Sequence, residues 1–160
     1  MDGIGLLNWG IPAYGLEYDT TLWEMLAKAW FDAYYTETNA PATYLENSAE
    51  FFRKVIDMGM KKDYLYSNLY TIYYELGDYN RAETALQEYE KEFPKSYLPH
   101  ALRGMLLITI ENGKEPENRD YALAYAAYWD AKELLTSQDD QTYFQQLESL
   151  IQQLKDNGWL

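Results

Sequence analysis

The chain has 160 residues, enough for one domain with its own core, and a formal net charge of −13. That charge disfavours a nucleic-acid backbone or an anionic membrane as partner and favours a partner with basic character. Cysteine is absent, which excludes disulfides and thiolate metal sites, and no apolar run approaches the roughly 20 residues of a membrane span.

The first 19 residues are apolar but have no helical period, because four glycines and a proline interrupt them. We expect a non-helical lead-in over residues 1–19 that packs on the first helix, in a groove of the domain or on a second molecule. This stretch is also similar to the cut end of a longer polypeptide.

The first helix is predicted from Thr20 to Tyr35. Asp19 or Thr21 can cap it, and Thr21 with Glu24 fits a capping box.

A turn-rich insertion, Thr36–Thr43, follows. The second helix is predicted from about Pro41 to Met58. Gly59 is expected to end it, because glycine readily adopts the left-handed conformation that closes a helix.

The clearest pattern spans Tyr66 to Pro94, where two amphipathic runs meet at Gly77-Asp78. Gly77 can end the first helix, Asp78 can cap the second, and Pro94 disfavours its continuation. Two helices joined by about two residues fold back as an antiparallel pair.

A third pair of helices is predicted from Tyr97 onward, interrupted by the acidic insertion Glu111–Asp120. A seventh helix opens at Asp139 or Asp140 and ends at Asn157-Gly158. Its many glutamines suit the polar outer face of a capping helix.

The central stretch resembles the tetratricopeptide repeat, a 34-residue helix–turn–helix unit. The family's pattern falls on Tyr66, Leu69, Tyr70, Tyr73, Gly77, Tyr79, Ala82, Leu86, Tyr89 and Pro94, with Tyr70 and Tyr89 in place of small residues. The phase extends back from Ala82 to Ser48 and forward from Tyr66 to His100. The outer two units carry nine and eight extra residues in their turns, and Arg103 stands where the pattern has leucine.

The resemblance implies one all-α domain, a right-handed solenoid of helical hairpins with about seven helices. Its parts would be the lead-in over 1–19, repeats over 20–62, 63–96 and 97–138, and a capping helix with a tail over 139–160.

In this family the first helix of each repeat lines an inner groove that binds a peptide. The resemblance therefore implies a partner-binding groove made by Glu24, Lys28, Phe31, Tyr64, Asn68, Thr71, Tyr74, Glu75, Leu98, Leu102, Met105 and Ile108. The carboxylate clamp of the chaperone-binding members is not expected, because Leu98 and Leu102 replace its last basic pair. Alternatively, the seventh helix, the lead-in or a second copy covers the apolar end of the groove.

His100 is the only histidine, so a histidine triad or a multi-histidine metal site is not expected. The acidic insertion lacks the ligand order of a calcium loop. We expect no catalytic residues, no cofactor and no metal. We expect instead a protein-interaction module or scaffold that binds a protein or peptide with apolar anchors and some basic character.

Two other functions stay open. Tyrosine-rich repeat segments with similar broken turns occur as C-terminal extensions of serine/threonine kinases and other signalling proteins of Gram-positive bacteria, which would make this chain a regulatory or sensory segment. A small-molecule-binding helical domain is the other. Homo-oligomerisation also stays open. The cytoplasm is slightly favoured as compartment over the outer side of a membrane-anchored protein.

Overall fold

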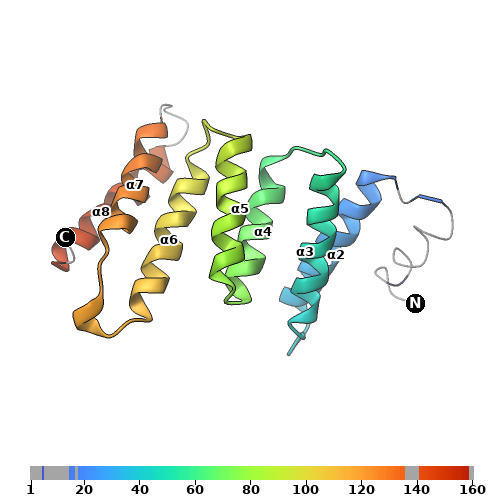
Figure 1. Ribbon diagram of the computed structural model, residues 1–160, viewed down its shortest axis with the longest axis horizontal. Helices are drawn as coiled ribbons and strands as arrows, with labels where there is room; N and C mark the ends of the chain where they lie inside the picture. The colour runs from blue at the N-terminus through green and yellow to red at the C-terminus, as the bar shows by residue number, and fades with distance from the viewer. Residues whose placement is uncertain (1–4, 6–14, 17, 136–140, 159–160) are drawn as a thin grey trace. The chain divides into compact units, whose positions relative to one another are not determined.

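The computed structural model describes residues 5, 15, 16, 18–135 and 141–158, and within them the chain is all-α, as the sequence predicts (Figure 1). No strand occurs in these residues. The helices are α2 (Thr20–Thr36), α3 (Thr43–Asp57), α4 (Asp63–Glu75), α5 (Tyr79–Glu92), α6 (Leu98–Asn112), the 3-10 turn η1 (Pro116–Asn118), α7 (Ala122–Leu134) and α8 (Gln141–Asp156). None of these described helices is long and apolar enough to cross a membrane.

Two compact units divide the chain within α5, one over Met1–Ala82 and one over Glu83–Leu160. In the first unit α2 packs on α3 and α3 on α4, and in the second α6 packs on α7 and α7 on α8. Packing between helices that are neighbours in the chain is typical of helical-repeat proteins, which confirms the expected architecture class.

The first helix begins as predicted, with Asp19 as its cap. Its Oδ1 accepts hydrogen bonds from the backbone N–H groups of Thr21 at 2.9 Å and Leu22 at 3.2 Å. The expected capping box between Thr21 and Glu24 is wrong, because the Glu24 carboxylate instead accepts hydrogen bonds from side chains of α2, α4 and the residue before α4.

The joint between α4 and α5 forms as the sequence predicts. Gly77 has a φ of 71°, the left-handed conformation that a side chain would disfavour. The next backbone N–H, of Asp78, donates to the Tyr73 carbonyl at 2.9 Å and closes α4. The Asp78 carboxylate then accepts the Arg81 N–H at 3.0 Å and caps α5.

The extra residues of the first unit do not all lie in a turn. Helix α2 has 17 residues against 13 in α4, so part of the insertion lengthens the helix. Thr36 ends α2 and Thr43 begins α3, which leaves a six-residue connector, 37–42, where a longer turn was expected. Likewise Glu111 and Asn112 belong to α6, so the second insertion starts at Gly113 rather than Glu111.

Two sets of side-chain hydrogen bonds, made by Arg119 and by Glu111, hold the connector between α6 and α7. The Arg119 guanidinium donates to the Asn112 carbonyl at 3.2 Å and to the Lys114 carbonyl at 3.1 Å, close to the end of α6. The Glu111 carboxylate accepts the Lys114 ammonium at 2.6 Å and the Asp120 N–H at 2.9 Å. These two hydrogen bonds hold the pKa of Glu111 below its ordinary value.

Small residues stand where helices approach most closely. The buried Ser48 hydroxyl of α3 donates to the Ala27 carbonyl of α2 at 2.8 Å. In the second unit Gly104 of α6 faces the ring of Tyr128 on α7, and a Cβ added at Gly104 would lie 2.4 Å from Cε1 of that ring.

Arg103 departs from the apolar residue expected at its position because it joins α6 to α5 by ion pairs. Its Nε lies 3.0 Å from Glu83 and its Nη1 lies 3.0 Å from Glu90. His100, the neighbour one turn earlier, has Nε2 3.6 Å from the same Glu90. A charged network therefore replaces an apolar contact on this side of α6.

Some sequence-based expectations fall outside the described residues. These are most of the lead-in over 1–19, the caps Asp139 and Asp140, and the tail at 159–160. The non-helical lead-in therefore stays a prediction.

Candidate functional site

The twelve groove residues predicted from the sequence fall in both units. Eight belong to α2 and α4 of the first unit and four to α6 of the second.

The first group centres on a buried carboxylate. Glu24 accepts hydrogen bonds from Lys28 Nζ at 2.5 Å, Lys62 Nζ at 3.0 Å and the hydroxyl of Tyr64. We call these four residues the Glu24 cluster. The two ammonium groups also lie near the Tyr64 ring, 4.5 Å and 5.5 Å from its centroid, so cation–π attraction adds to the ion pairs. Lys62 was not predicted, since it precedes the repeat positions.

The cluster fixes the charge of Glu24. Its side chain is only 10% exposed, and burial alone would raise its pKa. The hydrogen bonds from Lys28, Tyr64 and Lys62 outweigh burial and lower the pKa to about 2. The same contact raises the pKa of Lys28. Glu24 is therefore ionised at neutral pH and already paired within its own unit.

Aromatic packing holds two further residues of the first group. The Phe31 ring lies 5.0 Å from that of Tyr35, and the Tyr74 ring lies 5.7 Å from Tyr70 and 6.0 Å from Tyr79. Both side chains are half-buried. They contribute to the packing of the unit while keeping part of their surface open.

The remaining members of the first group are polar. The Thr71 hydroxyl donates to the Ser67 carbonyl of its own helix at 3.0 Å, and Asn68 is half-buried. Glu75 is exposed, and its charge adds to burial in raising the pKa of Tyr35.

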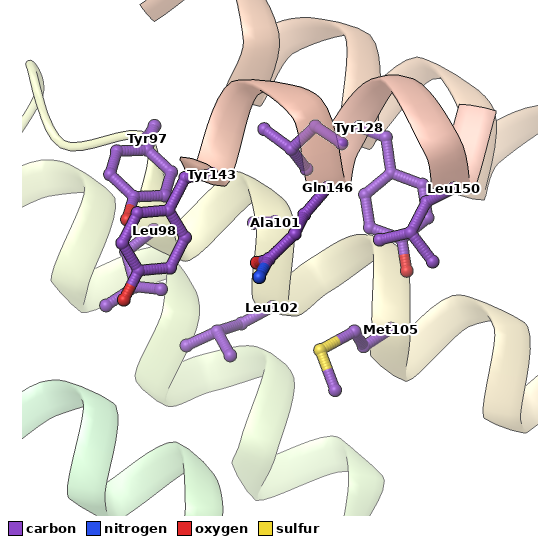
Figure 2. Close-up of a pocket in the computed structure, with 10 residues that line it drawn as sticks. Tyr97, Leu98, Ala101, Leu102, Met105, Tyr128, Tyr143, Gln146 and Leu150 are labelled. Atoms are coloured by element: carbon purple, nitrogen blue, oxygen red, sulfur yellow. The ribbon is translucent and has the colours of Figure 1, made fainter. Parts of the chain in front are cut away.

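The second group borders an apolar hollow between α6 and α8, which we call the α6–α8 hollow (Figure 2). Its volume is about 140 Å³. It is lined by Tyr97, Leu98, Ala101, Leu102, Met105, Tyr128, Tyr143, Gln146, Leu147 and Leu150. Figure 2 shows Leu102 and Met105 on one side and Tyr143, Gln146 and Leu150 on the other.

The hollow has a buried floor and an open rim. Tyr128 and Leu147 are 1% and 4% exposed, whereas Met105 and Tyr143 are 48% and 50% exposed. The Tyr143 ring lies 5.4 Å from that of Tyr97 and forms one end of the rim. Apart from tyrosine hydroxyls, the amide of Gln146 is the one polar side-chain group in the lining.

Three of the four predicted residues of α6 meet in this hollow: Leu98, Leu102 and Met105. Ile108 instead packs against the core cluster that contains Tyr121, Tyr128 and Ile151 of the second unit. It is half-buried and does not line the hollow.

The opposite wall comes from α8, which the sequence analysis treated as a capping helix. Tyr143, Leu147 and Leu150 follow helical spacing, and that spacing could have shown that this face of α8 looks toward α6. The seventh helix, α8, therefore covers the apolar end of the predicted groove only in part, because it forms one wall of the hollow and leaves an opening.

A second depression lies along α7 and α8, lined by Trp129, Lys132, Glu148, Ser149, Ile151, Gln152 and Lys155. Lys132 pairs with Glu148 at 2.9 Å, and its Nζ lies 5.1 Å from the Trp129 ring and 4.9 Å from the Phe144 ring. Two of its charged groups, Lys132 and Glu148, therefore already pair with each other.

No model of a known protein family matches the chain, and no curated protein is significantly similar to it. The tetratricopeptide resemblance therefore rests on the spacing of this chain's own residues. Among the residues that the structure describes, no group of three or more His, Asp or Glu is placed to hold a metal ion.

Proposed function

We propose that this chain is a protein-interaction domain of tetratricopeptide-like construction that binds a segment of a partner protein. The observation that carries the proposal is the α6–α8 hollow, an apolar concavity with a half-exposed methionine and a half-exposed tyrosine on its rim. Concave apolar surfaces with a few polar groups are where proteins bind ligands and partner side chains.

The energetics favour an occupant of the hollow. Burying a large apolar side chain contributes roughly 1.5–3 kcal/mol, so covering the exposed halves of Met105 and Tyr143 is worth about 2 kcal/mol together. An inserted side chain adds its own burial to this. A single anchor of this size supports weak to moderate affinity, which is usual for peptide recognition by grooves.

The Glu24 cluster is the weaker candidate for the primary contact. Its carboxylate is paired with two ammonium groups and a hydroxyl, so a partner would have to replace existing hydrogen bonds to use it. Tyr74 and Asn68, which keep partly open surfaces, remain predicted secondary contacts.

Selection from a random peptide library displayed on phage, with the full chain immobilised, tests the proposal. We expect selected peptides to bind with measurable affinity by fluorescence anisotropy, and Met105→Glu to weaken them at least tenfold. Met25→Glu is the matched control, because Met25 of α2 is 51% exposed and lies in the other unit. Failure to select any binding peptide, with the chain folded by circular dichroism, would remove the proposed function.

A further inference from the structure

We infer that the α6–α8 hollow takes a single phenylalanine-sized side chain from a partner segment that carries Lys or Arg beside it. This inference rests on the proposed function and names the chemistry of the partner. The size of the hollow matches such a side chain. An apolar cavity of about 150 Å³ accommodates a benzene molecule, and the hollow has about 140 Å³. One phenyl ring matches this volume, and the larger indole of tryptophan would project from the open mouth.

The rim favours an aromatic ring over an aliphatic chain. Tyr97 and Tyr143 already form a tilted pair with centroids 5.4 Å apart, and a third ring beside them can take an edge-to-face position. Met105 reaches the hollow from the opposite side (Figure 2). Its flexible thioether adapts to the shape of a ring and makes favourable sulfur–aromatic contacts.

Gln146 supplies the polar contact that fixes the orientation of the anchor. It is exposed and its amide has no hydrogen-bond partner within the part of the chain that the structure describes. Figure 2 shows this side chain reaching across the hollow from α8 toward Leu102. An amide there can donate to and accept from the main chain of a segment that runs over the mouth.

The negative charge of the second unit favours basic residues next to the anchor in the partner segment. Residues 83–160 contain 7 Lys or Arg and 14 Asp or Glu, a formal net charge of −7. Three of the cations, Arg103, Lys114 and Lys132, are already paired with carboxylates of this unit. The net negative charge of this unit therefore attracts a basic segment and speeds its encounter. A second copy of this chain carries the same −13 charge, which opposes self-association.

The test reads the composition of peptides selected on the full chain and then resynthesised. We expect Phe to be enriched, with Lys or Arg within four positions of it. Changing that Phe to Ala should weaken binding at least tenfold, and changing it to Trp several-fold. Replacing the neighbouring basic residues with Glu should weaken binding more than tenfold at 50 mM NaCl and less at 500 mM.

Two variants locate the anchor. Met105→Glu places a charge on the rim, and Leu102→Trp fills the hollow without changing charge, so both should abolish Phe-dependent binding while Met25→Glu does not. Selected peptides that are acidic, lack an apolar anchor or bind Met105→Glu equally well would overturn the inference. If such peptides still bind specifically, the proposed function survives it.

A third measurement addresses a different occupant. Sedimentation of the unliganded chain should show a monomer for the wild type and for Met105→Glu. A wild-type dimer that Met105→Glu dissociates would identify the hollow as a contact between copies and would overturn the inference.

Discussion

Replacing Gly104 with alanine tests the closest helix approach in the second unit. The new methyl would lie 2.4 Å and 2.5 Å from two ring carbons of Tyr128, well inside van der Waals contact. Tyr128 is 1% exposed and belongs to the core cluster, and its ring also borders the α6–α8 hollow. Either the buried ring must leave its packed position or one of the two helices must shift.

Two opposing effects decide how much Gly104→Ala changes the free energy of unfolding. Alanine is favoured over glycine by about 1 kcal/mol in the middle of a helix. Overpacking a filled core costs typically 1–3 kcal/mol, and an overlap of more than 1 Å against a buried ring belongs near the upper end, about 3 kcal/mol. The expected net loss is about 2 kcal/mol of unfolding free energy, equivalent to roughly 4–8 °C in Tm for a chain of this length.

Urea denaturation followed by circular dichroism measures this loss. Gly113→Ala is the control, because its nearest neighbour would be the Ile110 carbonyl oxygen at 3.4 Å, and its effect should stay within about 0.5 kcal/mol. Combining Gly104→Ala with Tyr128→Leu should cost less than the sum of the two single changes, since the smaller side chain makes room for the methyl. A neutral or stabilising Gly104→Ala would show that helix propensity outweighs the contact, and the reasoning would fail.

Three further changes test local interactions. The folded pKa of Glu24, about 2, lies below its ordinary value of 4.5. The wild type should therefore hold this stabilisation above about pH 5 and lose it as the pH falls toward 2. Glu24→Gln should flatten that part of the pH–stability curve and lower stability at pH 7. The pKa difference corresponds to about 3 kcal/mol, but the half-exposed lysines reduce the expected loss to about 1–2 kcal/mol. If the stability of Glu24→Gln fell between about pH 5 and pH 2 as steeply as that of the wild type, the hydrogen bonds to Glu24 would not be the source of this pH dependence. Asp78→Ala should cost about 1 kcal/mol by removing the cap of α5, measured by urea denaturation, whereas no loss would mean that water replaces the cap. Arg103→Met should cost less than about 1 kcal/mol because Glu83 and Glu90 keep solvent access, and the difference should shrink in 1 M NaCl. A loss that persists in high salt would point to packing by the arginine stem.

Local rules predicted much of the fold. The joint at Gly77-Asp78 forms because both residues act within a few positions of themselves, one by adopting positive φ and the other by accepting the Arg81 N–H. Ser48, which lies one 34-residue step before Ala82, makes a buried contact with α2. Such patterns are readable because the spacing of a helix repeats along the chain.

Contacts between distant positions were not readable in the same way. Glu24 fits a capping box by spacing, yet its partner Lys62 lies 38 residues later and only the packing of α2 near α4 brings them together. Arg103 interrupts the apolar pattern of α6, and its guanidinium forms ion pairs with Glu83 and Glu90 of α5.

The candidate site was predictable in part. Leu98, Leu102 and Met105 came from their repeat positions, and all three line the hollow. The shape of that hollow depends on α8, whose place follows from its packing on α7 rather than from the repeat pattern. Whether a partner uses these residues stays a prediction.

The hydrogen-bonded connector between α6 and α7 is a poor site for inserting a tag or label. Arg119 binds carbonyls near the end of α6, so a tag or fluorescent domain inserted at Glu115 or Glu117 would pull on a segment tied to a helix end. The connector over residues 37–42 has exposed Thr38 and Asn39, and Asn39 already occupies a tight turn with a φ of 60°. Exposed turns of this kind tolerate insertions best. The two long connectors, alike in the sequence, therefore differ as sites for labels, and residues 38–40 are the better choice.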